Sequence, residues 1–348
     1  MVNAKVISII AIAVGVMTVA FGGLLMSKSQ NLTQIPGYVD EAFSQWMTVH
    51  NKVYESPAEL LHRKINFLKN YFQVQASNAD PANTHTSGLN QFADLSNEEF
   101  IATYTGYNYN PDKVRKVDEN PKVVLRQQSQ YIDWTTVPGV VNPVENQGQC
   151  GSCWAFSATA AVESAYAIAK KNLNVLSEQQ LVDCSTSYGN NGCNGGLMDN
   201  AFKYLIAVGG QELNSDYPYT AVNGSCKFAA GKIAENINNY QDVTQNSCKS
   251  LQQQVLTGPV SVAVQANAWQ TYTGGIFAVS TCGTQLNHGV VLVGYINCSG
   301  TNVYKVRNSW GASWGEQGYI RLNADTNIGG VKGICGICMD PSYPIVSK

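Results

Sequence analysis

All ten cysteines of the 348-residue chain lie at or after Cys150. This asymmetry predicts a C-terminal domain that carries disulfides and a preceding domain that has none. Disulfides persist in oxidising compartments, so the sequence indicates a protein of the secretory pathway. A chain of this length can form two or three compact units, each with its own core. The net charge of −2 gives no electrostatic support for nucleic-acid binding.

The N-terminus carries an uncharged apolar run over residues 6–26, with a lysine on each side. This run is long for a secretory signal peptide, whose apolar region is usually about 7–15 residues, and close to the about 20 residues that span a membrane. Residues 18–20 are suitable for signal-peptide cleavage. Residues 1–27 are therefore interpreted as either a cleaved signal peptide or a signal anchor. Both alternatives place the rest of the chain in the lumen.

Cys153 begins an alanine-rich apolar run that extends to Lys170. A thiol in the first turn of a helix lies near the positive end of the helix dipole, which favours the nucleophilic thiolate. Such a cysteine also needs a base. The chain has four histidines, His50, His62, His85 and His288. We expect the first three to be removed with an N-terminal segment, which leaves His288 as the candidate base.

Three separated segments follow the order of one enzyme family. Residues 147–156 resemble the active-site signature of papain-like cysteine peptidases, and residues 286–290 resemble the segment that carries their general base. Residues 307–311 resemble the segment with the asparagine that orients this base. The resemblance implies an α+β, papain-like two-lobe fold over residues 127–348, with a helical left lobe and a β-barrel right lobe, preceded by a helical inhibitory prodomain.

The resemblance also implies catalytic roles. Cys153 and His288 would form a thiolate–imidazolium pair, and the Gln147 amide with the Cys153 backbone N–H would stabilise the oxyanion. Asn308 would orient the imidazole, and Trp310 would shield that hydrogen bond from water. The implied reaction is peptide-bond hydrolysis through an acyl-enzyme by a cathepsin L-like endopeptidase, without a cofactor or a metal.

Other interpretations of these residues remain. Cys150 and Cys153 could be a redox pair, and together with Cys335 and Cys338 they could form a four-thiolate zinc site, although the two pairs lie far apart for a zinc ribbon. A non-catalytic binding protein on the same fold is a rival of a different class. Such proteins usually lack the nucleophile or the base, and both are present here.

A second set of motifs lies upstream of Cys150. Residues 38–100 predict two helices and a turn, and one side of the second helix, residues 59–78, carries Glu59, Arg63, Phe67, Asn70, Val74 and Asn78. This spacing resembles the prodomain helix of cathepsin L-like proenzymes, and residues 88–94 resemble their second prodomain motif. The resemblance implies an inhibitory propeptide over residues 28–126. Its extended linker, residues 106–130, would cross the active-site cleft in reverse and be cut between residues 124 and 130.

The C-terminal part predicts helices first and strands later. Residues 153–170, 177–184 and 197–208 are predicted helices, with a capping box at Ser177 and Gln180 and a C-terminal stop at Gly209. Short β-branched runs broken by glycine predict strands at residues 259–266, 289–296, 303–307 and 318–322. This order favours two lobes with a cleft between them.

The resemblance implies disulfide pairs Cys150 with Cys193, Cys184 with Cys226, and Cys282 with Cys335, and it leaves Cys153 free. Cys248, Cys298 and Cys338 remain, and three cysteines cannot all pair within one chain. At least one of them is therefore a free thiol or forms an intermolecular bond. N-x-S/T sequons at Asn31, Asn223 and Asn297 are candidate glycosylation sites.

By the same resemblance, the glycine-rich segment 193–198 would bind the substrate backbone and open into an apolar pocket. The expected substrate-binding residues are Gly195, Gly196, Leu197, Met198, Ala263, Leu286, Asn287, Gly289, Trp310 and Asp340. With Asp340 at the base of the pocket, we expect Arg or Lys to be accepted as well as Leu or Phe. The alternative is that Asp340 faces solvent.

The implied partners are protein and peptide substrates, the chain's own propeptide as an intramolecular inhibitor, and cystatin-type inhibitors. A membrane would be contacted only through an N-terminal anchor before processing. The expected locations are the lysosome, an acidic vacuole or the extracellular space. Protonation of the prodomain carboxylates, which include Glu59, Asp94, Glu98 and Glu99, predicts activation at acidic pH.

Overall fold

The computed structural model describes residues 36–113, 115, 130–279 and 282–347. The chain divides into two compact units, Met1–Val53 and Tyr54–Lys348. In the first unit the described element is helix α2, Gly37–Val49, on which the rings of Phe43 and Trp46 stack with centroids 6.0 Å apart. The predicted signal peptide or anchor lies outside the described residues. None of the helices in the described ranges is long and apolar enough to cross a membrane.

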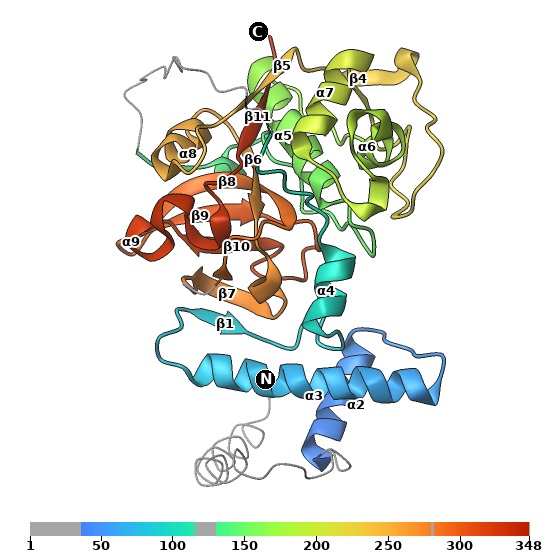
Figure 1. Ribbon diagram of the computed structural model, residues 1–348, viewed down its shortest axis with the longest axis vertical. Helices are drawn as coiled ribbons and strands as arrows, with labels where there is room; N and C mark the ends of the chain where they lie inside the picture. The colour runs from blue at the N-terminus through green and yellow to red at the C-terminus, as the bar shows by residue number, and fades with distance from the viewer. Residues whose placement is uncertain (1–35, 114, 116–129, 280–281, 348) are drawn as a thin grey trace. The chain divides into compact units, whose positions relative to one another are not determined.

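The second unit begins with what we call the prodomain segment, residues 54–115. It contains helix α3 (Pro57–Ala79), strand β1 (His85–Ser87) and helix α4 (Asn97–Tyr104) (Figure 1). Asn70 explains part of the polar spacing along α3, because its amide donates to the backbone carbonyls of Ala93 and Leu95 at 2.8 Å each. The side of α3 that carries Asn70 is therefore the side that holds the loop before α4.

Helix α4 was not predicted, although the sequence carries a signal for its start. Ser96 accepts a hydrogen bond from the Glu99 N–H, and the Glu99 side chain accepts one from the Ser96 N–H. This reciprocal pair is a capping box, which satisfies two backbone donors that a helix N-terminus leaves free. The helix is only 8 residues long, so the capping box was a stronger local signal than periodicity.

The C-terminal domain, residues 130–347, has a helical lobe. Its elements are α5 (Cys153–Lys170), α6 (Glu178–Cys184), α7 (Met198–Val208), β3 (Gln211–Glu212) and β4 (Ile233–Glu235). The left-handed C-cap of α7 is Gly209, as predicted. The predicted capping box is only half present. Ser177 accepts from the Gln180 N–H, but Gln180 Oε1 accepts from the Glu212 N–H, and the Ser177 N–H donates to the Glu212 carbonyl.

The strand-rich lobe contains β2 (Ile132–Asp133), β5 (Asn239–Asp242), β6 (Val260–Val264), β7 (Tyr272–Phe277), β8 (His288–Cys298), β9 (Thr301–Arg307), β10 (Tyr319–Asn323) and β11 (Ser342–Ile345). Helices α8 (Cys248–Val255) and α9 (Thr326–Gly329) accompany it. Short 3₁₀ helices occur at Trp134–Thr136, Thr186–Tyr188, Gly192–Asn194, Ala230–Lys232, Asn267–Trp269, Gly330–Lys332 and Ile334–Gly336.

One sheet joins this lobe to the prodomain segment. Its strand order is β1-β7-β10-β9-β8-β6-β11-β5, with β2 paired to β8. Strand β1 pairs antiparallel with β7, so the prodomain segment supplies the edge strand. The predicted strands correspond to β6, β8, β9 and β10. Strands β5, β7 and β11 were not predicted from the sequence.

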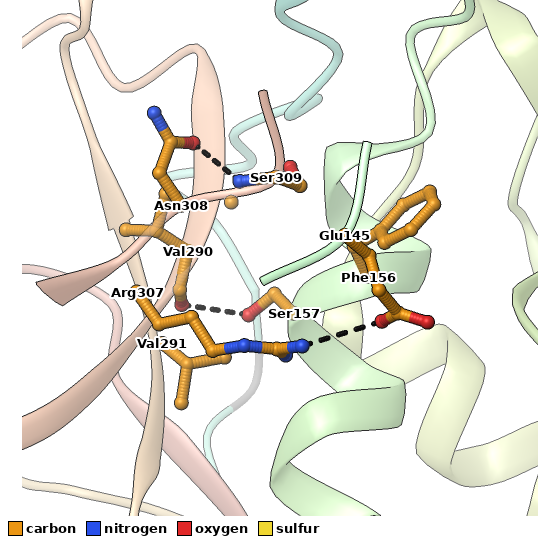
Figure 2. A pocket seen from close by; sticks show the side chains of 9 residues that line it. Glu145, Phe156, Ser157, Val290, Val291, Arg307, Asn308 and Ser309 are labelled. Atoms are coloured by element: carbon orange, nitrogen blue, oxygen red, sulfur yellow. Dashed lines mark hydrogen bonds and ion pairs between the residues drawn. The ribbon is translucent and has the colours of Figure 1, made fainter. Parts of the chain in front are cut away.

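The two lobes meet where α5 packs against β8, β11 and β6. The Ser157 hydroxyl donates to the Val290 carbonyl at 2.7 Å, and the Arg307 guanidinium reaches the Glu145 carboxylate at 3.3 Å (Figure 2). A cavity of about 10 Å³ lies between these groups. The contact is thus tightly filled, and it positions the start of α5 relative to the start of β8.

Four disulfides cross-link the C-terminal domain: Cys150–Cys193, Cys184–Cys226, Cys248–Cys338 and Cys282–Cys335. Among the three cysteines that the sequence left open, Cys248 therefore pairs with Cys338, and Cys298 has a free thiol. The four-thiolate zinc interpretation is wrong, because three of its four sulfurs bond to other cysteines. The redox pair is wrong for the same reason.

Candidate active site

Cys153 is the first residue of α5 and is completely buried. Its Sγ accepts a hydrogen bond from the Gly289 N–H at 3.3 Å. The preceding residue, Ser152, makes no side-chain cap for the helix, and its hydroxyl lies 2.6 Å from the Tyr219 hydroxyl instead. The thiol therefore lies at the free N-terminus of the helix, where the dipole and backbone N–H groups favour negative charge.

His288 and Asn308 come from neighbouring strands. His288 begins β8 and Asn308 follows β9, and His288 Nε2 lies 2.7 Å from Asn308 Oδ1. Because the amide oxygen can only accept, Nε2 carries the proton. Nδ1 has no hydrogen-bond partner among the described residues and is free to act as a base. The Trp310 ring stacks on the imidazole with centroids 4.6 Å apart, which excludes water from this side.

Gln147 is held so that its amide N–H₂ faces the cleft. Its Oε1 accepts from the Ser309 hydroxyl at 2.7 Å. Its Nε2 donates to the Cys150 carbonyl at 2.9 Å and to the Tyr104 carbonyl at 3.3 Å. The Trp310 indole also donates to the Tyr104 carbonyl, at 3.0 Å. A carbonyl of the prodomain segment therefore lies between two donors of the predicted site.

The backbone after Tyr104 continues across the glycine-rich segment. The N–H groups of Gly106 and Tyr107 both donate to the Asn287 carbonyl, at 2.9 and 2.8 Å. Gly196 donates to the Gly106 carbonyl at 2.9 Å and accepts from the Asn108 N–H at 3.1 Å. The bridge between Tyr107 and Gly196 is parallel. The cleft thus holds an extended peptide through backbone hydrogen bonds.

Glycine is required on both sides of this close approach. A Cβ on Gly106 would lie 2.1 Å from the Gly151 carbonyl oxygen. Gly195 has a φ of +106°, and a Cβ there would lie 2.8 Å from the Gly106 carbonyl oxygen. Any larger residue at either position would force the two backbones apart.

The Tyr107 side chain fills a buried pocket, which we call the Tyr107 pocket. Tyr107 belongs to the same buried apolar cluster as Met198, Ala263 and Leu286, and the partly buried Leu197 packs against this cluster. The Tyr107 hydroxyl donates to Asp340 Oδ2 at 2.5 Å. Asp340 is 1% exposed, so the alternative that it faces solvent is wrong. The residues that the sequence predicted for the site lie either around Cys153 or around Tyr107.

Burial controls the charge state of the site in this form. It raises the pKa of the Cys153 thiol to about 12, although backbone N–H groups of Gly289 and Trp154 act in the opposite direction. Burial also lowers the pKa of His288 to about 4, against the effect of the Asn308 hydrogen bond. Thiol and imidazole are therefore both neutral at pH 7 while the prodomain segment covers them. The predicted thiolate–imidazolium pair stays a prediction for the form from which the prodomain segment has been removed.

The residues that sequence reasoning missed are Tyr104, Tyr107 and Lys113, all of which lie in or beside the predicted linker. Lys113 Nζ lies 2.7 Å from Asp199 Oδ2, 2.9 Å from Asp242 Oδ1 and 2.7 Å from Asp340 Oδ1. No motif marks these positions, since their contacts depend on how the segment crosses the cleft. The available signal was the glycine at 106 between two tyrosines, in a segment already expected to enter the cleft.

The fold and the cleft are those of a thiol protease held inactive by its own N-terminal segment. Residues 128–345 match the family described as "Papain family cysteine protease". Residues 43–100 match the "Cathepsin propeptide inhibitor domain (I29)". The chain therefore belongs to the papain family of cysteine proteases, in proenzyme form.

Relatives include plant proteases. Oryzain beta chain from Oryza sativa subsp. japonica is 45% identical over 292 residues, which cover 82% of this chain and 61% of that protein. The chain thus spans less than two thirds of the length of this relative. Ananain from Ananas comosus is 40% identical over 312 residues, which cover 88% of each.

Solved proenzymes have the same fold. Recombinant stem bromelain precursor has a TM-score of 0.81 at 39% identity, over 89% of this chain and 99% of that chain. Digestive procathepsin L 3 of the Tenebrio molitor larval midgut has a TM-score of 0.78 at 37% identity, over 91% and 100%. The similarity therefore extends over the prodomain segment as well as the C-terminal domain.

Proposed function

We propose that this protein is a cathepsin L-like cysteine endopeptidase, made as a zymogen, that hydrolyses peptide bonds with Cys153 as nucleophile. The observation that carries the proposal is the extended backbone of residues 105–108 in the cleft, directly after the Tyr104 carbonyl that Gln147 and Trp310 hold. The cleft therefore accommodates a peptide beside Cys153.

In the proposed reaction the thiol proton moves from Cys153 to Nδ1 of His288, the nitrogen that has no other partner among the described residues. The thiolate attacks the carbonyl carbon, and Gln147 Nε2 with the Cys153 N–H stabilises the oxyanion. His288 then protonates the leaving amine, and water hydrolyses the acyl-enzyme. Asn308 keeps the proton on Nε2 throughout. Removal of the prodomain segment exposes Cys153 and His288 to water, which favours the charged pair of a thiolate and an imidazolium.

The parallel bridge at Gly196 supports inhibition by the prodomain segment. We infer that substrates pair with Gly196 in the antiparallel direction, so the prodomain segment crosses the cleft in reverse and is not presented for attack. The boundary between propeptide (28–126) and mature enzyme (127–348) falls largely outside the described residues. The proposed locations are the lysosome, an acidic vacuole or the extracellular space, and the four disulfides support an oxidising compartment.

Asn223 and Asn297 are proposed glycosylation sites, and both residues are exposed. The sequon at Asn31 lies outside the described residues. Cystatin-type inhibitors are proposed partners of the mature cleft.

Acidification of the purified proenzyme with a thiol reductant should release a fragment that ends between residues 124 and 130. An epoxysuccinyl probe should then add once, at Cys153, and intact-mass analysis measures both events. Cys153→Ala should neither process itself nor react with the probe. An intact, unlabelled wild-type chain that stays unreactive after addition of a trace of active protease would favour the non-catalytic rival.

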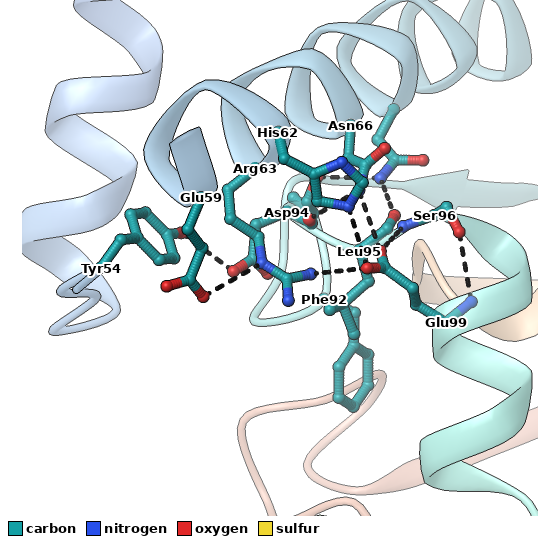
Figure 3. A network of polar contacts seen from close by, with 12 residues as sticks. Tyr54, Glu59, His62, Arg63, Asn66, Phe92, Asp94, Leu95, Ser96 and Glu99 are labelled. Atoms are coloured by element: carbon teal, nitrogen blue, oxygen red, sulfur yellow. Dashed lines mark hydrogen bonds and ion pairs between the residues drawn. The ribbon is translucent and has the colours of Figure 1, made fainter. Parts of the chain in front are cut away.

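Acid activation is proposed from a polar network in the prodomain segment (Figure 3). Glu99 Oε1 lies 3.1 Å from Arg63 Nη1 and 3.0 Å from His62 Nε2. Burial alone would raise the pKa of Glu99, but the Ser96 N–H, His62 and Arg63 outweigh it and hold this pKa below its ordinary value. Because the pKa of Glu99 is lowered in the folded prodomain, its ionised carboxylate stabilises this fold at pH values above about 4.3, the ordinary pKa of a glutamate. This stabilisation is lost as the pH falls through the lowered pKa.

Carboxyl groups of the C-terminal domain have the opposite pH dependence. Burial raises the pKa of Glu235 to about 8 and that of Glu163 to about 7. A raised pKa gives stability that is present in acid and is lost as pH rises through that value. Acid therefore weakens the prodomain segment while it favours the neutral form of these buried groups.

Glu99→Gln should speed proenzyme conversion at mildly acidic pH by about 3- to 10-fold, because it removes a partly buried, charge-assisted contact. Conversion is followed by electrophoresis in the absence of glycosaminoglycan. Glu41→Gln is the matched control, since Glu41 is exposed on α2, where its carboxylate accepts from the Gln45 amide, and this variant should convert like wild type. Equal conversion rates of the wild type at neutral and acidic pH would contradict acid activation.

Asp340→Ala should lower kcat/KM selectively for substrates with Arg or Lys in the Tyr107 pocket. We expect a loss of about 10- to 100-fold, the size of one hydrogen bond to a charged group. Paired fluorogenic peptides that differ only in Arg or Leu at this position measure the effect. An unchanged preference between Arg and Leu would contradict a role for Asp340 in specificity.

A further inference from the structure

The Tyr219 hydroxyl connects two positions of the active-site backbone. It donates a hydrogen bond to the Gln147 carbonyl at 2.7 Å, and it lies 2.6 Å from the Ser152 hydroxyl. Gln147 carries one of the two proposed oxyanion donors, and Ser152 directly precedes Cys153, whose N–H is the other. Gln147 and Ser152 are both completely buried. One phenol group therefore contacts both sides of the proposed oxyanion site.

The single proton of this phenol fixes the direction of both hydrogen bonds. A carbonyl oxygen can only accept, so Tyr219 donates to Gln147, and the Ser152 hydroxyl donates to the Tyr219 oxygen. The other acceptor near the Ser152 hydroxyl, the Cys150 carbonyl, lies 3.5 Å away and offers a weaker bond. Burial raises the pKa of Tyr219 above its ordinary value, so the phenol keeps its proton at neutral and acidic pH.

The backbone of Gln147 is held from both lobes. Its N–H donates to the Ser309 carbonyl at 2.8 Å in the strand-rich lobe, and its carbonyl accepts from Tyr219 in the helical lobe. The next residue, Gly148, lies against the Tyr219 segment, because a Cβ on Gly148 would be 3.2 Å from the Ala221 Cβ. Ser309 thus fixes the N–H of Gln147, and Tyr219 fixes its carbonyl.

The segment that carries Tyr219 is itself anchored to the helical lobe. The Tyr219 N–H donates to Asn214 Oδ1 at 3.1 Å, and the Thr220 N–H donates to Gln179 Oε1 on α6 at 2.8 Å. The Tyr219 ring packs edge-on against Phe156, in the first part of α5, with centroids 4.9 Å apart. The hydroxyl is therefore presented to Gln147 and Ser152 from a fixed support.

We propose that Tyr219 is a positioning residue for peptide hydrolysis, whose hydroxyl holds the backbone at Gln147 and Ser152 so that the Gln147 amide and the Cys153 N–H meet the same oxyanion. This inference rests on the proposed function and extends it to a residue outside the predicted site. All of these residues belong to the C-terminal domain, so the contacts remain after the prodomain segment is removed. Donors to an oxyanion act best when they are in place before charge develops.

The first test is Tyr219→Phe in the activated enzyme, which keeps the ring against Phe156 and removes only the hydroxyl. We expect kcat for a fluorogenic peptide to fall by about 5- to 20-fold, less than for the loss of a donor itself, while KM stays within about twofold. Tyr217→Phe is the matched control, since the Tyr217 hydroxyl donates to Asp183 Oδ2 at 2.7 Å and so anchors the same segment to α6. This control should keep the kcat of the wild type.

Two outcomes of this comparison overturn the proposal. One is an unchanged kcat in Tyr219→Phe. The other is an equal loss in Tyr219→Phe and Tyr217→Phe, because the effect would then come from a loosened segment and not from the contacts of Tyr219 with the site.

The second test separates the oxyanion site from the nucleophile. In alkylation by iodoacetamide the Cys153 thiolate displaces iodide from carbon, so no oxyanion forms. Tyr219→Phe should therefore keep the alkylation rate and its pH profile while peptide hydrolysis slows. A parallel loss of alkylation and hydrolysis overturns the proposal, since the hydroxyl would then act on the thiol or on the whole fold.

The third test is a double-mutant cycle between Tyr219→Phe and Gln147→Ala. Tyr219→Phe should lower kcat less in the Gln147→Ala background than in the native background, because the amide that the hydroxyl positions is then absent. Equal losses in the two backgrounds overturn the proposal.

The last test needs no catalytic activity and so separates this inference from the proposed function. The side-chain amide of Gln147 is followed by nuclear magnetic resonance in the isotope-labelled, full-length Cys153→Ala proenzyme, and Gln147→Ala identifies its signals. Tyr219→Phe should shift or broaden these signals, and Tyr217→Phe should leave them unchanged. Unchanged signals in Tyr219→Phe overturn positioning by Tyr219, whereas a wild type that hydrolyses no peptide contradicts the proposed function. If Tyr219→Phe does not fold, Ser152→Ala replaces it, because this variant removes the hydroxyl that donates to Tyr219.

Discussion

Replacing His288 with alanine is expected to lower kcat/KM for peptide substrates by about 10⁴-fold or more, because one side chain performs two proton transfers. Its Nε2 is committed to Asn308 at 2.7 Å, and its Nδ1 has no partner among the described residues. No other histidine is present in residues 127–348 to replace it. Without this base the Cys153 thiol must ionise unaided.

The variant must be processed by a trace of added protease, since it should not process itself, and its folded concentration is set by absorbance. A fluorogenic peptide measures kcat/KM, and the pH dependence of alkylation by iodoacetamide reports the thiolate. The alkylation profile should shift to higher pH. His85→Ala is the control, because His85 lies in β1 of the prodomain segment and is absent after activation. A variant that retains a tenth of the activity would contradict the proposed role of His288.

The second large effect is expected for Gln147→Ala, which should lower kcat by about 10²–10³-fold with little change in KM. The amide nitrogen is aimed by the Ser309 hydroxyl, 2.7 Å from Oε1, so it is in place before charge develops. A donor to the oxyanion acts in the transition state more than in the ground state. Steady-state kinetics of the activated enzyme separate the two parameters.

Ser309→Ala is the graded control for Gln147. It removes the hydrogen bond that orients the amide but leaves the amide itself, so we expect a smaller loss of kcat. An increase in KM at unchanged kcat for Gln147→Ala would contradict an oxyanion role and would indicate ordinary substrate binding instead.

Elements with strong local signals were predicted well. Helix α5 spans Cys153–Lys170, as the alanine-rich run indicated, and α7 ends at the predicted Gly209. Strand β7 shows where local signals fail. Its Gly274 and Gly275 resemble a turn, yet the segment is a strand because β1 and β10 hydrogen-bond to its two edges. Pairing with distant segments overrides the local preference of glycine.

The disulfides show the same limit. The pairing of Cys248 with Cys338 joins residues 90 positions apart, and nothing local to either cysteine distinguishes it from Cys298. Only the packing of α8 beside the turn before β11 brings these two sulfurs together. Likewise, no property of Tyr104 or Tyr107 alone indicated that these residues occupy the cleft.

The sequence by itself determined which side chains are available for chemistry: one histidine after residue 126, a cysteine at a helix start, and the order of motifs that defines the family. Only the tertiary structure decided their charge states. The helix dipole predicted a thiolate at Cys153, but burial beneath the prodomain segment raises its pKa to about 12. Tertiary structure also brought Lys113 to three aspartates. Desolvation and Coulomb interactions depend on neighbours in space, which are distant in sequence.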